Sequence, residues 1–147
     1  RLLAQFAANG SNVTIRRNVM VLHPDKLRVG RNVLINHNTL INAGGEVSIG
    51  DDVVIGPGCM ILTNNHVGSR FHGSIAYAPV TIGSNVWLAA QVVVTPGASI
   101  GNNVIVAAGS VVTEDIPDRS IAAGSPARVI RALHLPFVPG TQLESRI

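Results

Sequence analysis

Large aliphatic residues recur at every sixth position between residues 80 and 113, and most positions between them are small or polar. The repeating residues are Ile82, Leu88, Val94, Ile100, Val106 and Val112. A period of six fits neither an amphipathic helix, which repeats about every 3.6 residues, nor a half-buried strand, which alternates. It is typical of a solenoid whose short strands each bury one large side chain before the chain turns a corner. The pattern therefore predicts an all-β fold, a parallel β-helix.

Earlier in the chain the same period occurs in groups of three. Val29, Ile35 and Ile41 form one group, and Ile49, Ile55 and Ile61 form another, with extra residues between the groups. Three hexapeptides make one coil with three flat faces, so the extra residues fall at the same corner of successive coils. The longest insertion, residues 63–79, interrupts the period completely. Loops of this length are usually functional or disordered.

We expect a single domain with three parts. Residues 1–12 form an N-terminal cap, because the open end of a solenoid exposes unpaired strand edges that something must cover. Residues 13–113 form the β-helix, with the loop at 63–79. Residues 114–147 form a short C-terminal helix and a tail.

The segment after the repeats has the signals of a short helix. Ser125 followed by Pro126 is typical of a helix N-cap and first helical residue, so we expect a helix that runs to about Leu133. Arg128 and Arg131 would then lie three residues apart on one helical face.

The composition supports a narrow, repetitive interior. Of the 147 residues, 46% are hydrophobic but only 3% are aromatic, which suits layers of uniform aliphatic side chains. The net charge of +3 comes without a block of Lys or Arg, so we expect no nucleic-acid partner. No apolar run approaches the roughly 20 residues of a membrane span, and no secretory signal pattern occurs, so we predict no transmembrane segment and a cytoplasmic location. The chain begins with Arg rather than Met, as a trimmed or partial chain would.

The cysteine content limits the covalent chemistry of the chain. Cys59 is the only cysteine, so no disulfide framework exists. It stands at a repeat position for a small residue, and we expect it to be a buried packing residue.

Two stretches resemble a known family: residues 49–66, IGDDVVIGPGCMILTNNH, and residues 79–131, which run from PVTIGSNVW to SPARVIR. They resemble the left-handed parallel β-helix acyltransferases with hexapeptide repeats, in particular the galactoside and maltose acetyltransferases and the exopolysaccharide O-acetyltransferases of the colanic-acid type. The similarity covers about residues 13–133. It implies a left-handed coil, a homotrimer with active sites at the clefts between subunits, and acetyl-CoA as co-substrate. It implies no tightly bound cofactor and no metal.

The resemblance also implies a mechanism of O-acetyl transfer to a saccharide. A sugar hydroxyl is a poor nucleophile, and His66 matches the family histidine that removes its proton as general base. A neutral imidazole can do this near pH 7. The backbone N–H of Ala90 matches a donor to the tetrahedral oxyanion, and we expect it to lie on a strand. Asn36 matches an acceptor-site asparagine, although a stacked corner asparagine is the alternative interpretation.

The same resemblance implies a CoA site. The residues matched to CoA contacts are Trp87, Ala90, Ala108, Gly109, Arg128 and Arg131. The guanidinium groups suit phosphates, and the small residues allow the pantetheine arm to approach the backbone. Trp87 has a second interpretation, packing on the outside of the solenoid.

Two parts of the chain depart from the family pattern. Glu114 stands where the family often has Lys, and a carboxylate there would repel the phosphates of CoA. Gly44 and Gly45 stand where some sugar enzymes carry an Asp that touches the acceptor.

Other functions remain open. A γ-type carbonic anhydrase would need three histidines around zinc, but WLAAQVVV offers none on the resumed coil, and His66 and His72 both fall in the loop. A non-catalytic solenoid scaffold is the second alternative. Within the enzyme hypothesis, which places the protein in polysaccharide biosynthesis, the acceptor could be a polysaccharide repeat unit, a nucleotide-linked sugar or a small sugar.

Overall fold

A computed structural model describes residues 10–68 and 73–134 of the chain. Residues 1–9 of the predicted cap, the tail beyond residue 134 and His72 lie outside the described residues. Within the described ranges, no helix has the length and apolar character needed to cross a membrane.

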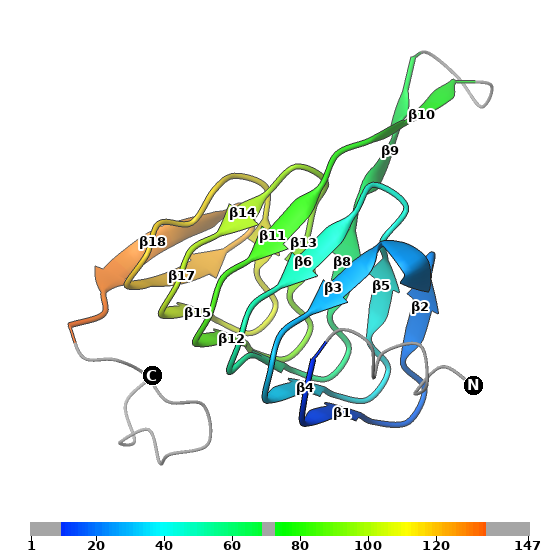
Figure 1. The fold of residues 1–147 in the computed structure, drawn as a ribbon. Coiled ribbons are helices and arrows are strands. Elements are labelled where there is room, and N and C mark those ends of the chain that lie inside the picture. The colour runs from blue at the N-terminus through cyan, green and yellow to red at the C-terminus, as the bar shows by residue number, and fades with distance from the viewer. Residues whose placement is uncertain (1–9, 69–72, 135–147) are drawn as a thin grey trace.

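Three sheets, parallel except for the last strand of one of them, form a triangular stack of coils (Figure 1). Sheet A contains β1 (Val13–Ile15), β4 (Val33–Ile35), β7 (Val54–Ile55), β12 (Val86–Leu88), β15 (Val104–Val106), β17 (Ser120–Gly124) and β18 (Ala127–Ala132). Sheet B contains β2 (Met20–Leu22), β5 (Leu40–Asn42), β8 (Met60–Leu62), β13 (Val93–Val94) and β16 (Val111–Val112). Sheet C contains β3 (Leu27–Val29), β6 (Val47–Ile49), β11 (Val80–Ile82) and β14 (Ser99–Ile100). The all-β parallel solenoid predicted from the six-residue period is confirmed.

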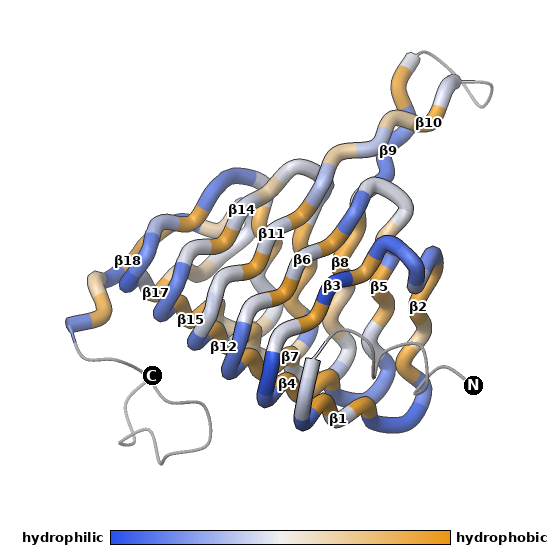
Figure 2. Tube along the Cα trace, in the orientation of Figure 1, coloured by the Kyte–Doolittle hydropathy of each residue, from blue (hydrophilic) through white to orange (hydrophobic). Residues whose placement is uncertain are grey.

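The residues at the sixth positions stack in columns along the interior. In the paired registers, Ile35, Ile55, Leu88 and Val106 form the column of sheet A, and Ile41, Ile61, Val94 and Val112 form that of sheet B. All of these side chains are fully buried. Figure 2 shows the same arrangement as hydrophobic positions that recur from coil to coil, separated by hydrophilic corners. Aliphatic layers of this kind are the main source of stability in the fold, because burial of each such side chain contributes about 1.5–3 kcal/mol.

Each coil turns three corners, which we name by the sheets that they join: C/A, A/B and B/C. At the C/A corner, side-chain amides and carboxylates bond from coil to coil, as where Asn32 Nδ2 donates to Asp52 Oδ1 at 2.9 Å. The backbones of neighbouring coils also approach closely there. A Cβ on Gly83 would lie 2.7 Å from the backbone of Gly101, so only glycine fits.

The insertions collect at the B/C corner, as the grouping of the repeats predicts. A short 3-10 helix, η1 (Pro24–Lys26), occupies this corner in the first complete coil. From the same corner, β9 (Asn64–Val67) and β10 (Ser74–Tyr77) of the inserted segment extend as an antiparallel pair, which we call the hairpin. The hairpin projects well beyond the three sheets (Figure 1).

The predicted C-terminal helix is wrong, because its residues form the antiparallel strand β18. Ser125 and Pro126 form the turn between β17 and β18 instead of a helix start. The last parallel strand, β17, would otherwise leave its outer edge unpaired, and β18 satisfies those backbone groups. The β-branched pair Val129–Ile130 also favours a strand.

Candidate functional site

The A/B corner brings together four of the predicted site residues. Asn36, Ala90, Ala108 and Gly109 each belong to the turn that follows a strand of sheet A. Ala90 and Ala108 occupy the same place in neighbouring coils, and Asn36 lies two coils away, about 10 Å along the stack. A Cβ on Gly109 would have no heavy atom within 4 Å, so a ligand can approach the backbone at this corner.

Ala90 lies in the turn between β12 and β13, not on a strand as predicted. Its carbonyl accepts a hydrogen bond from the Gly109 N–H at 2.9 Å. Over residues 10–68 and 73–134, no group accepts a hydrogen bond from the Ala90 N–H. The amides on either side of it do bond to neighbouring coils, Ala89 N–H to the Val106 carbonyl and Gln91 N–H to the Pro57 carbonyl, both at 2.9 Å. A donor such as the Ala90 N–H is what an oxyanion site requires.

Asn36 is half-buried at the same corner. Its Nδ2 donates to the Ile55 carbonyl at 3.1 Å, and its backbone N–H donates to the same oxygen at 3.0 Å. Corner asparagines elsewhere in the stack bond to each other, as Asn18 Nδ2 does to Asn38 Oδ1 at 3.1 Å, whereas Asn36 bonds to a backbone carbonyl of the next coil. The half-buried position also leaves the side chain within reach of a ligand at the corner, so both interpretations of Asn36 stay open.

Trp87 lies in the middle of β12 and faces outward from sheet A. It packs with Leu133 against the buried side chains of Ile105 and Ile121 on the neighbouring strands. Within a single chain, the Trp87 ring therefore packs on the outside of the solenoid, which was the second interpretation of this residue.

His66 lies on β9, exposed on the projecting hairpin. Its backbone N–H donates to Asn65 Oδ1 at 2.9 Å, and its cross-strand neighbour on β10 is Ile75. The hairpin leaves the B/C corner, whereas Ala90 lies at the A/B corner. A single chain therefore does not bring His66 and Ala90 together (Figure 1).

Arg128 and Arg131 lie on β18 rather than on a helix. A register shift in the pairing of β17 with β18 places them opposite Ala123 and Ile121, which are two residues apart on β17. Alternate positions of a strand share a face, so the two guanidinium groups can still act together. Arg128 Nη2 lies 3.2 Å from Glu114 Oε1. Glu114, which stands where the family often has Lys, thus forms an ion pair with Arg128. Because the pair is exposed, it stabilises the fold by at most about 1 kcal/mol.

The root of the hairpin is tied to the body of the solenoid by polar side chains that the sequence pattern did not identify. Asn42 Nδ2 donates to Asn64 Oδ1 at 2.7 Å, and Asn42 Oδ1 accepts from the Gly44 N–H at 3.1 Å. The buried Thr63 hydroxyl donates to the Asn42 carbonyl at 2.7 Å. The ring of Tyr77 lies against Gly44. The six-residue pattern carries no signal for this cluster, because its members stand outside the periodic positions.

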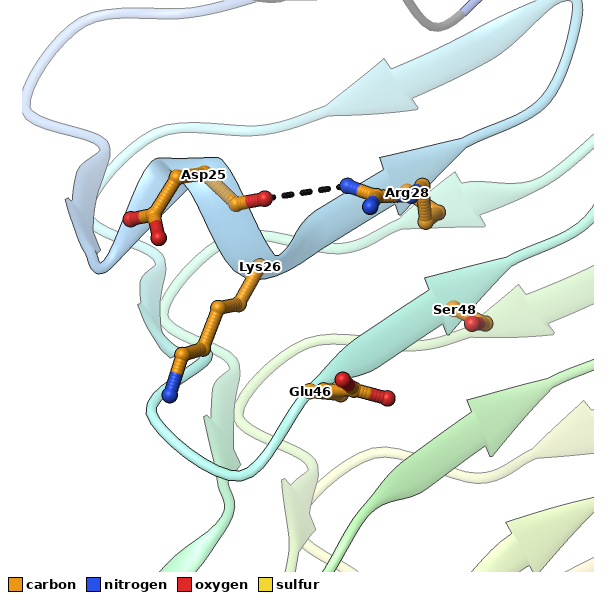
Figure 3. A pocket seen from close by; sticks show the side chains of 5 residues that line it. All are labelled: Asp25, Lys26, Arg28, Glu46 and Ser48. Carbon is orange, nitrogen blue, oxygen red and sulfur yellow. Dashed lines mark hydrogen bonds between the residues drawn. The ribbon is translucent and has the colours of Figure 1, made fainter.

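A small polar hollow lies on the outer face of sheet C (Figure 3). Its volume is about 80 Å3, and it is lined by Asp25, Lys26, Arg28, Glu46 and Ser48. Pockets for small ligands usually measure about 300–1,000 Å3, so this hollow is too small for a sugar or for CoA. Lys26 Nζ donates to the Gly44 carbonyl at 2.9 Å and Arg28 Nη1 to the Asp25 carbonyl at 3.0 Å, so both cations hold the corner together. In the described part of the chain, no three His, Cys, Asp or Glu side chains gather as a metal ion would need.

The Cys59 thiol should be unreactive in the folded protein. Cys59 is fully buried, its Sγ lies 3.1 Å from the Ala89 carbonyl, and burial raises the pKa of the thiol. Because the thiolate is the reactive form, a thiol reagent at pH 8 should modify Cys59 only after a denaturant unfolds the chain. Rapid modification of the native protein would contradict this packing role.

Residues 79–114 match the bacterial transferase hexapeptide family (six repeats). The galactoside O-acetyltransferase of Escherichia coli K12 is 39% identical to this chain over 132 residues, which are 88% of this chain and 65% of that enzyme. The chain therefore spans less than two thirds of this relative's length.

Solved structures give the same match at the level of the fold. A maltose O-acetyltransferase from Clostridium difficile 630 superposes with a TM-score of 0.86 at 35% identity, covering 91% of this chain and 73% of that one. A hexapeptide-repeat acetyltransferase from Vibrio cholerae O1 biovar eltor, solved with acetyl-CoA, superposes with a TM-score of 0.84 at 30% identity, covering 90% and 76%. These neighbours are left-handed β-helices, and a coil of the opposite hand would not superpose on them. The chain therefore belongs to the hexapeptide-repeat acetyltransferase family.

Proposed function

We propose that the protein is an acetyl-CoA-dependent O-acetyltransferase that transfers the acetyl group to a hydroxyl of a saccharide. The observation that carries the proposal is the 39% identity with a galactoside O-acetyltransferase along 88% of the chain. A neighbour of the same fold that was solved with acetyl-CoA supports the choice of donor. The cytoplasmic location and a role in polysaccharide biosynthesis belong to this proposal as predictions.

In this proposal His66 is the general base and the Ala90 N–H is an oxyanion donor. The two groups lie at different corners of one chain, and the hairpin that carries His66 extends away from its own solenoid. The hairpin of one subunit would therefore reach the A/B corner of the next. Three copies arranged in this way form a homotrimer with three equivalent clefts, each completed by two subunits.

Coenzyme A would lie along the A/B corner of the subunit that supplies Ala90. Ala108 and Gly109 leave room there for the pantetheine arm, and Asn36 would face the acceptor from the same corner. The phosphates would meet Arg128 and Arg131, so phosphate binding would compete with Glu114 for Arg128. Trp87 would border the cleft with the edge of its ring.

Calorimetric titration of CoA and acetyl-CoA tests the donor site directly. We expect saturable binding that the Arg128→Ala/Arg131→Ala double variant weakens by at least about tenfold, because each lost charge-assisted hydrogen bond is worth about 1.5–3 kcal/mol. Glu114→Gln should strengthen binding, since it frees Arg128 from its present partner. The absence of CoA binding at about 1 mM would contradict the proposal and favour a non-catalytic solenoid scaffold.

A further inference from the structure

The face of the hairpin that carries His66 also carries three other side chains. In the antiparallel register, His66 is opposite Ile75 and Asn64 is opposite Tyr77. Directly opposite residues share a face of an antiparallel pair, and residues two apart on a strand share a face as well. Asn64, His66, Ile75 and Tyr77 therefore form one surface, which we call the His66 face. Val67 and Ala76 point to the opposite face.

Contacts at the hairpin root confirm this orientation. The amide of Asn64 accepts from Asn42 at 2.7 Å, and the Tyr77 ring lies against Gly44, two residues further along the same coil. A Cβ placed on Gly44 would be 2.6 Å from Tyr77 Cε1 and 3.2 Å from His23 Cδ2. The absence of a side chain at Gly44 is thus what admits the Tyr77 ring to this position.

The Tyr77 ring rests against Gly44 on one side, and the residue is still 53% exposed, so a ligand can reach it. It is the only tyrosine in a chain with 3% aromatic residues. Asn64 is its cross-strand neighbour, Asn42 donates to Asn64, and His23 lies beside Gly44 as well, so amide and imidazole groups lie near the ring. An accessible aromatic face bordered by amide and imidazole groups suits a pyranose, because the ring face attracts sugar C–H groups while the polar neighbours meet hydroxyls.

We infer that the His66 face binds the saccharide acceptor and that Tyr77 is the platform for its pyranose ring. This inference rests on the proposed function. Tyr77 lies opposite Asn64, and Asn64 is two residues from His66 on the same strand. Residues two apart on a strand are separated by about 6.6 Å, so the distance from Tyr77 to His66 along the hairpin is comparable with the width of one sugar ring. A pyranose seated on Tyr77 thus presents a hydroxyl to His66.

Steady-state kinetics of Tyr77 variants test the inference, with methyl β-galactoside and maltose as probe acceptors and CoA release as the signal. Tyr77→Ala should raise the KM for the acceptor by about tenfold, the change that about 1.4 kcal/mol produces, with kcat and the KM for acetyl-CoA unchanged. Tyr77→Phe should stay within about twofold of the wild type, because it keeps the ring. Gly44→Ala should shift the acceptor KM in the same direction as Tyr77→Ala, since its methyl group displaces Tyr77 Cε1.

Val67→Ala is the matched control, because Val67 is 50% exposed on the opposite face of the same hairpin. It should leave both KM values unchanged. An unchanged acceptor KM in Tyr77→Ala would overturn the inference, and so would a fall in kcat alone, which would make Tyr77 a support for the hairpin. Wild-type protein that binds CoA but neither probe at about 10 mM would also overturn it, while the donor site would stand. If the wild-type protein did not bind CoA at all, that result would contradict the proposed function itself rather than the role of Tyr77.

Discussion

Replacing His66 by Ala should lower kcat by about 10²- to 10⁴-fold, which is the usual contribution of a general base. The His66 side chain is exposed on the projecting hairpin and does not pack in the core, so the substitution should leave the fold intact. The affinity for CoA should not change, because the groups assigned to CoA lie at the A/B corner and on β18. Acetyl transfer measured under saturating acetyl-CoA, together with calorimetric titration of CoA, checks both expectations.

Two comparisons make the His66 result specific. Val67→Ala removes a neighbouring side chain from the opposite face of the hairpin and should keep wild-type kcat. His66→Ala protein mixed with a variant that lacks the CoA arginines, Arg128→Ala/Arg131→Ala, should regain part of the activity if each cleft is built from two subunits. A His66→Ala variant with wild-type kcat would contradict the role of this residue as general base.

Val94→Asp should unfold the protein or bring it close to unfolding. Val94 is fully buried in the centre of sheet B, between Ile61 and Val112 in the neighbouring coils. The interior column offers no partner for a charge, and burial of an unpaired carboxylate costs several kcal/mol. That cost is comparable with the whole stability of a typical domain, about 5–15 kcal/mol. Unfolding in urea, followed by circular dichroism, should show a much lower midpoint or no folded baseline.

The pH dependence of the Val94→Asp variant gives an independent check. Burial raises the pKa of the new carboxyl in the folded state above its unfolded value, so the folded state binds the proton more tightly. Stability lost at neutral pH should therefore return as the pH falls below the raised pKa. Thr81→Asp is the control, because Thr81 is exposed on β11 and its replacement should cost no more than about 1 kcal/mol. Equal destabilisation at Val94 and Thr81 would contradict the assignment of the interior columns.

Much of the fold follows from local sequence. The six-residue period is visible because each strand contributes a large inward residue at the same point of every coil, so stacking repeats the pattern rather than mixing it. The columns that contain Ile35, Ile61 and Val94 were predictable for this reason. The B/C corner as the place of insertions was predictable too, since it follows from counting residues between groups.

The C-terminal segment shows where local signals fail. Ser125–Pro126 fits a helix start, but the same two residues also fit a tight turn, and the choice depends on the edge of β17. An unpaired strand edge beside the segment makes the antiparallel strand β18 the better solution. That edge exists only once the whole solenoid is stacked, so a local pattern could not reveal it.

The candidate site divides in the same way. Local sequence was enough to predict the coil and its insertions, and family resemblance added His66, Asn36 and Ala90 as candidate groups. The three-dimensional arrangement decided that the Ala90 N–H lies in a turn without a partner in the described chain, and that His66 stands at a different corner. It also decided that Tyr77 shares a face with His66 and rests on Gly44, because register and packing between residues more than thirty positions apart are set by the hairpin and the coil stack together. The six-residue period predicts which side chains point inward. Contacts between side chains on the outside depend instead on where the corners and insertions lie in space.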